Sequence, residues 1–511
     1  MKVILIILDG WGIAPPSYGN AITQASTPTL NSLEASYPSL LLQASGIAVG
    51  IPWGEEGNSE VGHLNIGAGR IVPQYLPRII EAIRDESFFK NKALRKAARH
   101  VKKNSSSFHI MGLVSSGSVH SYIDHVDGLL EFAKRESLPR VYLHIFTDGK
   151  DSPPEEAVKL VAQLKERMET KNLGKISSIV GRIFAMDRNE HWEYTKTAYE
   201  LITEGRGTAT DDPVTYLEKS YKEGVNDQRI EPAIVEKQGT VRDGDAVVFF
   251  NFREDSARQL TRAFINDDFD NFNRKKIKNL AFVAMTQYEE SVPRSMVAFP
   301  PIDIKNTLGE VLSTNNKTQL RIAESEKYAH ITYFFNGLKE KPLTGEERIL
   351  IPSQGAPHYE KYPEMQAPKI AQHAVERAKD FDFILINFAN ADMLAHTGDV
   401  KAATQGVEVI DTYIKMILEN QDKNTTTIIT SDHGNAEDML NARTGEVRTE
   451  HSSNPVPFYF IDKKMSGGHP QPLSTKQTRG ILGDVAPTIL ELMKIPIPKE
   501  MTGKSLLPLL K

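Results

Sequence analysis

VILIILDG, residues 3 to 10, is a run of six apolar residues that ends in an aspartate and a glycine. A short β-branched run that stops at a polar turn is typical of a buried strand in an α/β sheet. Similar runs recur along the chain, separated by stretches of helical period, and the expected strands are Val3–Leu8, Phe108–Val114, Val141–Phe146, Ile176–Val180, Ala246–Phe250, Leu280–Met285, Phe383–Phe388, Thr427–Thr430 and Val456–Ile461. The pattern predicts an α/β protein with largely parallel sheets.

The composition is that of an ordinary globular protein. The chain has 511 residues, of which 40% are hydrophobic and 25% charged, so it should hold more than one domain. The formal charge of -5 gives no overall reason to bind nucleic acid or an anionic membrane. The chain has no cysteine, which excludes disulfides, zinc-thiolate sites and cysteine nucleophiles.

The apolar N-terminal run does not fit a signal peptide. It is interrupted by Asp9, before the roughly 7 to 15 apolar residues that such a segment needs, and no small-residue cleavage site follows. No other run approaches the roughly 18 apolar residues of a membrane span. We therefore expect a cytoplasmic protein.

Two proline-bearing stretches, 71–77 and 292–301, look like linkers around a segment of domain size. They predict that residues 77–297 are inserted into a domain made of residues 1–76 and 298–511. The alternative from punctuation alone is a pair of loops inside one large sheet.

Several carboxylates and histidines follow expected strands or stand beside a glycine or proline. They are Asp9, Asp392, His396, Asp432, His433 and His451. Hard divalent cations prefer carboxylate and imidazole side chains as ligands. In open α/β sheets, bound molecules and ions lie beyond the carboxyl ends of the strands. A spacing of four puts Asp392 and His396 on one helical face, although a solvated face is the commoner reading of such a pair. The set predicts two metal ions rather than one.

Ser59 lies in a glycine-rich stretch, residues 55–70, before a segment that can form a helix. A helix N-terminus favours a phosphate, and coordination to a divalent ion would lower the pKa of the serine hydroxyl enough to make it a nucleophile. Without that context, Ser59 is more often simply the N-cap of the helix.

Cationic side chains recur near the ends of expected strands, mostly in the inserted segment. They are Lys150, Arg182, Arg188, Arg253 and, further on, Lys327. His120 and Asp151 could add hydrogen bonding and proton transfer. Each alone reads as a surface charge, but together they predict a pocket for a small, multiply anionic substrate.

The chain closely resembles the cofactor-independent (2,3-bisphosphoglycerate-independent) phosphoglycerate mutases from end to end. The resemblance is carried by Ile7–Gly12, Gly57–His63 extended to Arg70, Met186–Arg188, Asn251–Arg253, Glu324–Tyr328, Asn387–His396, Ser431–Asn435, His451–Pro457, Gly483–Thr488 and Met501–Leu506. It implies an alkaline-phosphatase-like parallel-sheet domain, built from both chain ends, with a second inserted α/β transferase domain. It also implies interconversion of 3-phosphoglycerate and 2-phosphoglycerate in glycolysis and gluconeogenesis, without 2,3-bisphosphoglycerate, by a protein that we expect to be a monomer.

The resemblance also implies roles for the candidate residues. Asp392, His396 and His451 would hold one manganese ion, and Asp9, Ser59, Asp432 and His433 the other, with cobalt or zinc also allowed by the ligand chemistry. Ser59 would accept the phosphoryl group, and Asp151 would be the acid and base. Substrate binding would fall to His120, Lys150, Asp151, Arg182, Arg188, Arg253 and Lys327.

Two positions depart from the family pattern. Lys150 stands where an arginine is usual, and Ser256 stands where a second arginine usually follows Arg253. Lysine cannot reproduce the two-pronged contact of a guanidinium with an anion, so we expect altered substrate affinity rather than lost chemistry. Arg258 and Arg262 are close by, but simple replacement at the same place is doubtful.

Two other functions stay open at this stage. One is a metal-dependent phosphomonoesterase or phosphopentomutase of the same superfamily, which would not need the set of side chains that holds glycerate. The other is an inactive binding protein with the same fold, against which the complete set of expected ligands argues.

Overall fold

The computed structural model describes residues 1–465, 467 and 472–510. The chain divides into two compact units: unit 1 consists of Met1–Gln74 and Asp303–Lys511, and unit 2 is Tyr75–Ile302. The boundaries expected from the prolines lie two residues from the first division and five from the second. No helix in the described part of the chain is long and apolar enough to cross a membrane.

Unit 1 is built on an eight-stranded sheet whose order is β11-β10-β12-β1-β13-β14-β2-β15. In that order the strands are Glu346–Ile351, Gln319–Glu324, Phe383–Phe388, Lys2–Leu8, Thr425–Thr430, Val456–Ile461, Ser39–Gln43 and Thr478–Ile481. The five strands from β11 to β13 are parallel, and β14 runs antiparallel to both of its neighbours. Central strand β1 pairs with β12 and β13, so the residues after these three strands meet at one sheet edge.

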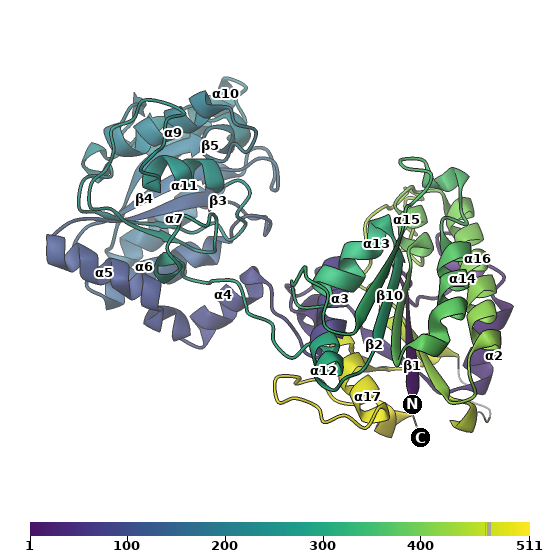
Figure 1. Cartoon of the computed structure of the whole chain (residues 1–511). Coiled ribbons are helices and arrows are strands. Elements are labelled where there is room, and N and C mark those ends of the chain that lie inside the picture. The colour runs from purple at the N-terminus through teal and green to yellow at the C-terminus, as the bar shows by residue number, and fades with distance from the viewer. Residues whose placement is uncertain (466, 468–471, 511) are drawn as a thin grey trace. The chain divides into compact units, whose positions relative to one another are not determined.

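Strand β1 is apolar throughout because both faces of the sheet are covered. Ile4, Ile6 and Leu8 pack in a core with α2 (Pro28–Ser36), α14 (Ala367–Arg377) and α16 (Val400–Asn420). The alternate residues of β1 pack in a second core with α3 (Ser59–Ala68), α12 (Leu308–Thr314) and α17 (Val485–Leu492). Figure 1 shows these two helical layers on either side of the sheet. The shorter helices of the unit are α1 (Ala21–Gln24), α13 (Ser325–Ala329) and α15 (Asn390–Ala395).

Unit 2 has a seven-stranded sheet of order β6-β7-β5-β4-β3-β8-β9. In that order the strands are Thr208–Ala209, Ala233–Ile234, Lys175–Gly181, Val141–Thr147, Phe108–Val114, Ala246–Phe249 and Ala281–Ala284. All pairs are parallel except β5 with β7. The helices are α4 (Tyr75–Arg84), α5 (Lys92–Asn104), α6 (Ile123–Arg135), α7 (Ala157–Lys171), α8 (Arg182–Ala185), α9 (Trp192–Glu204), α10 (Pro213–Lys222) and α11 (Arg258–Ile265). The prediction of an α/β fold with largely parallel sheets is confirmed.

Candidate active site

The predicted metal ligands of unit 1 gather at the carboxyl edge of its sheet. Asp9 follows β1, Asp392 lies in α15 directly after β12, and the pair Asp432-His433 follows β13. These four side chains are at most 2% exposed. The topology therefore brings together residues that lie more than 400 positions apart in the chain, as Asp9 and Asp432 do.

Ser59 is the first residue of α3 and is buried at the same edge. The N-cap is Asn58, whose side-chain oxygen accepts a hydrogen bond from the backbone N–H of Val61 at 3.0 Å. The alternative that Ser59 caps the helix is therefore wrong. Its hydroxyl is left to contact Asp9 Oδ1 at 3.1 Å and His433 Nε2 at 2.9 Å.

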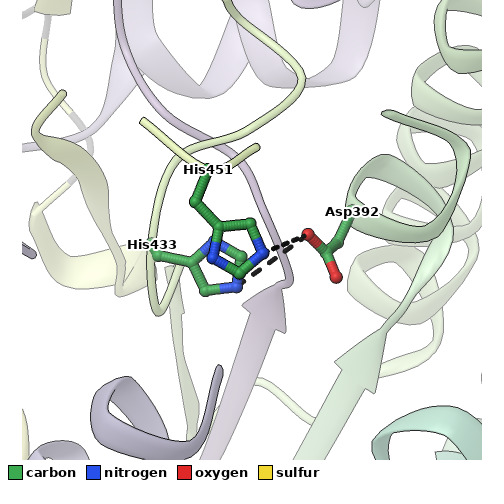
Figure 2. A group of neighbouring side chains, drawn as sticks. All are labelled: Asp392, His433 and His451. Carbon is green, nitrogen blue, oxygen red and sulfur yellow. Dashed lines mark ion pairs between the residues drawn. The ribbon is translucent and has the colours of Figure 1, made fainter. Parts of the chain in front are cut away.

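Two overlapping groups of ligand atoms could each hold a metal ion. The first is Asp9, Asp432 and His433, and the second is Asp392, His433 and His451. In Figure 2 the Nε2 atoms of His433 and His451 both face the carboxylate of Asp392. They lie 3.9 and 3.5 Å from its Oδ1. His396 joins the second group, because its Nε2 lies 3.3 Å from the same oxygen and 3.1 Å from His451 Nε2.

Backbone carbonyls orient the three imidazoles. The Nδ1 atom of His396 lies 2.7 Å from the carbonyl of Thr449, and that of His451 lies 2.8 Å from the carbonyl of Gly57. His433 Nδ1 lies 3.2 Å from the carbonyl oxygen of Gly434. A carbonyl can only accept, so each Nδ1 carries a proton and each Nε2 faces the centre, the arrangement in which a neutral imidazole could bind a metal ion.

Lys327 in α13 supplies the buried ammonium of the centre. Its Nζ lies 2.6 Å from both Asp9 Oδ1 and Asp392 Oδ2, and 2.9 Å from Ser59 Oγ. Although burial opposes the charged form, the carboxylates of Asp392 and Asp9 raise the pKa of Lys327. Conversely, burial would raise the pKa of Asp9 and Asp392, but the ammonium holds both well below the ordinary value.

The charges of the centre fit a divalent cation. Three buried carboxylates face a single lysine, and Asp432 Oδ2 has no well-formed hydrogen bond from any described residue, although His63 Nδ1, which also contacts the carbonyl of Ser59, lies 3.1 Å from it. Although burial opposes it, Asp432 and the other two carboxylates raise the pKa of His433 to about 10. Uncompensated charge at such depth is costly, and imidazole with carboxylate is a donor set that suits manganese, cobalt or zinc.

The predicted substrate residues of unit 2 form a second cluster, around Arg182 and His120. Arg182 Nη1 contacts Asp148, and lies 2.6 Å from Asp151 Oδ2. His120 Nε2 lies 3.7 Å from the same oxygen. Burial, with a smaller contribution from Arg182, lowers the pKa of His120 to about 4, so this imidazole is neutral at physiological pH.

Asp255 connects the remaining cations of that cluster. Its Oδ2 lies 2.6 Å from Arg188 Nη1 and 3.1 Å from Arg253 Nη2, and its Oδ1 lies 3.6 Å from His120 Nδ1. Lys150 is exposed. The cluster therefore brings together all of the predicted substrate residues of unit 2 except the exposed ammonium of Lys150, for which no contact with the others is seen among the described residues.

The comparisons with known proteins decide the family. The family model described as the BPG-independent PGAM N-terminus matches residues 79–290. The 2,3-bisphosphoglycerate-independent phosphoglycerate mutase of Moorella thermoacetica is 48% identical over 99% of this chain and 98% of its own length. That of Clostridium botulinum is 45% identical over 99% of both chains. The chain belongs to the 2,3-bisphosphoglycerate-independent phosphoglycerate mutases.

A solved structure supports the fold of this mutase. A phosphoglycerate mutase of Leishmania mexicana, determined at low cobalt concentration, is similar with a TM-score of 0.62 at 28% identity, covering 98% of this chain and 97% of the other. The resemblance stated from the motifs is thus confirmed. Full-length similarity to mutases also favours that function over the phosphatase, phosphopentomutase and inactive-protein alternatives.

Several residues that shape the site were not predicted. In unit 2 of the mutase they are Asp148 and Asp255, which hold the arginines, and in unit 1 they are His63, Asn387, Asn435 and Glu437. Asn387 donates to Asp9 Oδ2 at 2.7 Å, and Asn435 donates to Asp392 Oδ1 at 2.8 Å. Both asparagines lie within the motifs that carry the family resemblance. Their position next to the candidate ligands could therefore have indicated their contacts with those ligands.

The structure explains why the nearby arginines cannot replace the one missing at Ser256. Ser256 is buried, and its Oγ lies 3.2 Å from Asp255 Oδ1. Arg258 donates to the carbonyl of Tyr288 at 3.2 Å, and Arg262 pairs with Glu289 at 2.7 Å. Both guanidinium groups are therefore engaged away from Asp255.

Proposed function

We propose that this mutase interconverts 3-phosphoglycerate and 2-phosphoglycerate through a phosphoserine at Ser59. The observation that carries the proposal is the setting of the Ser59 hydroxyl, 2.9 Å from both His433 Nε2 and Lys327 Nζ and 3.1 Å from Asp9 Oδ1. A buried serine that only supports the fold does not require charged neighbours. A serine that accepts a phosphoryl group requires them, because they activate its hydroxyl.

Two divalent cations fit the centre, with Asp392, His396 and His451 holding one and Asp9, Ser59, Asp432 and His433 the other. Manganese is our choice from the family resemblance, and cobalt or zinc would suit the same donors. When bound, such ions lower the pKa of a hydroxyl and neutralise phosphoryl oxygens. We propose no requirement for 2,3-bisphosphoglycerate, in keeping with the names of the similar mutases.

The residues of unit 1 stabilise the transferring group. Ser59 Oγ, after losing its proton to solvent, would bond to phosphorus as the bond to the substrate oxygen breaks, in line with it, and would regain a proton when the phosphoryl group returns to glycerate. The ammonium of Lys327 lies close enough to share the charge on the phosphoryl oxygens. The first amides of α3, a helix of 10 residues, carry the positive end of the helix dipole next to the same atom.

Unit 2 would hold the glycerate. Arg182, Arg188 and Arg253 suit its carboxylate, with His120 and Lys150 as further hydrogen-bond donors. Asp151 would give a proton to the oxygen that leaves phosphorus and later take one from the other hydroxyl, so that protons balance over the cycle. Retaining glycerate between the two transfers is what separates a mutase from a phosphatase. We therefore assign metal binding to unit 1 and substrate binding to unit 2.

The test is a trapping experiment. The protein is incubated with 3-phosphoglycerate labelled with ³²P, quenched in acid and digested, and formation of 2-phosphoglycerate is followed without added 2,3-bisphosphoglycerate. We expect turnover, with label on the peptide that contains Ser59. Turnover without label on any serine in a rapid-quench series would contradict the phosphoserine route.

We further propose that the mutase works as a cytoplasmic monomer and needs no nucleic acid or membrane. The net charge of -5 supports the last point, because it gives no overall attraction to nucleic acid or an anionic membrane. Light scattering behind a sizing column checks the mass against 57.0 kDa for one chain.

A further inference from the structure

Glu437 is a buried carboxylate close to the metal ligands but is not one of them. It lies seven residues after the end of β13 and is 2% exposed. Its Oε2 accepts hydrogen bonds from the backbone N–H groups of Gly12 and Asn435, both at 2.9 Å. Its Oε1 accepts from the hydroxyl of Ser452 and from Asn454 Nδ2, the latter at 3.0 Å.

The four donors belong to the three loops that carry metal ligands. Gly12 follows Asp9 by three residues, Asn435 follows the pair Asp432-His433, and Ser452 follows His451 directly. Two of these loops also meet each other, since Ser452 N–H donates to the carbonyl of Gly434 at 2.9 Å. A single carboxylate thus connects segments from both ends of the chain.

The loops approach the carboxylate too closely for any side chain to stand between them. A Cβ on Gly12 would lie 2.2 Å from Oε1 of Glu437, and one on Gly434 would lie 2.4 Å from the same oxygen. Real Cβ atoms essentially never come so close to another heavy atom. The two glycines therefore allow the backbone to close around this carboxylate.

Glu437 has no capacity left to bind an ion. A carboxylate has about four lone-pair positions, and here each oxygen already accepts two hydrogen bonds. In the described part of the chain no lysine, arginine or histidine pairs with it. Burial of a carboxylate without a cation is tolerable only because these donors satisfy it, so removing its acceptors disturbs all three loops together.

We propose that Glu437 is a positioning residue that fixes the three ligand loops relative to one another and so sets the affinity of the centre for divalent cations. This inference rests on the proposed function, because it assumes that the loops hold metal. Groups outside the ligand set that orient the ligands typically change metal affinity by about 10- to 100-fold when they are removed.

The test compares Glu437→Gln with Glu346→Gln, using Mn²⁺ as the probe. Glutamine keeps the shape but places an NH₂ group against two donors. Glu346 is the matched control, because it is also buried in unit 1 and accepts hydrogen bonds from Asn336 and Arg348, but lies on β11 at the sheet edge. Equilibrium dialysis of metal-free protein gives the Mn²⁺ bound per chain, and scanning calorimetry gives Tm with and without Mn²⁺.

We expect Glu437→Gln to bind Mn²⁺ at least tenfold more weakly than the wild type, and Glu346→Gln to bind it as the wild type does. Equal Mn²⁺ affinity in Glu437→Gln and wild type would overturn the inference, as would equal weakening in both variants. Should Glu437→Gln not fold, Ser452→Ala removes one donor only, and an unchanged affinity in that variant has the same meaning. If the wild type binds no Mn²⁺, both this inference and the proposed function fail; if it binds Mn²⁺ and is active, only this inference is at stake.

Discussion

The ammonium of Lys327 lies 2.9 Å from the hydroxyl oxygen of Ser59, and both side chains are buried. The same ammonium lies 2.6 Å from Asp9 and from Asp392. A single cation therefore bridges Ser59, the proposed phosphoryl acceptor, and both candidate metal groups. This arrangement makes the consequences of changing the centre specific enough to measure.

Ser59→Ala should abolish mutase activity and leave the fold intact. The change removes one hydroxyl and keeps the cap at Asn58, so we expect Tm to shift by no more than about 4 °C. Activity is measured as formation of 2-phosphoglycerate, with Ser178→Ala, a buried serine of unit 2, as the control. Residual turnover above about a hundredth of the wild type, roughly 3 kcal/mol of activation free energy, would refute the phosphoserine route.

Removing divalent cations should inactivate the enzyme and lower its Tm. The physical reason is the repulsion among the buried carboxylates Asp9, Asp392 and Asp432, which Lys327, the imidazoles and nearby amides offset in part in the metal-free protein. Addition of Mn²⁺ should restore activity better than Mg²⁺, because imidazole ligands favour the transition ion. Asp432→Asn should reduce the response of Tm to Mn²⁺. A Tm that changes neither on addition of chelator nor on addition of Mn²⁺ would contradict the proposal that this centre binds metal.

Lys150→Arg should lower KM for phosphoglycerate and leave kcat within about threefold. A guanidinium can bind an anion through two parallel hydrogen bonds, which an ammonium cannot. The double variant Lys150→Arg with Ser256→Arg tests the second position at which the chain departs from the family pattern. Because Ser256 is buried, we expect the double variant to lose some thermal stability. Lys165→Arg is the control, because Lys165 is also exposed and pairs with Asp212 in the wild type. An unchanged KM in both variants would argue against a role for these positions.

Glu324→Gln should stabilise the protein increasingly as pH rises. Glu324 is fully buried, and burial, opposed in part by contacts with Ser353 and the backbone of Gln366, raises its pKa from 4.5 to about 7. Between those values the folded protein holds a proton that the unfolded chain releases, so wild-type stability falls as pH rises and levels off above about 7. The total loss in the free energy of unfolding of the wild type over this pH range amounts to about 3 kcal/mol.

The measurement is the difference in Tm between variant and wild type at pH 5 and pH 8. Glu346→Gln is again the control, because Arg321 and Arg348 outweigh burial and lower the pKa of Glu346, so its contribution is lost only at acid pH. A Tm difference for Glu324→Gln that is equal at both pH values would show that the wild-type carboxyl already ionises in the folded protein.

Much of the fold was legible in the sequence, because a strand that is buried on both faces is a short apolar run. All of the expected strands are present, within a residue or two at their ends. Strand β10 was missed because it carries Gln319, Arg321 and Glu324, all fully buried. Arg321 packs between the rings of Phe335 and Phe383, at 4.6 and 5.2 Å, so partners from other elements make its burial possible. The sequence around Arg321 does not indicate these partners, so the strand could not be predicted from it.

The candidate site divides in the same way. The candidate ligands stand just after a strand or beside a glycine or proline, and this position indicated them. Glu437 and Asp255 gave no comparable signal, because what they do depends on backbone amides and arginines that only the folded chain brings to them. Asn58 was overlooked as the helix cap because a serine, also a good cap, follows it.

Strand β1 lies between β12 and β13, which are encoded some 380 to 430 codons later. On the ribosome, this first strand must therefore wait while the whole of unit 2 is synthesised, and domains generally fold as they emerge. The nascent chain cannot assemble its ligand set before His451 has left the exit tunnel. The proposed metal centre is thus completed late in biosynthesis, and a chain that stops before His451 lacks one of its proposed ligands.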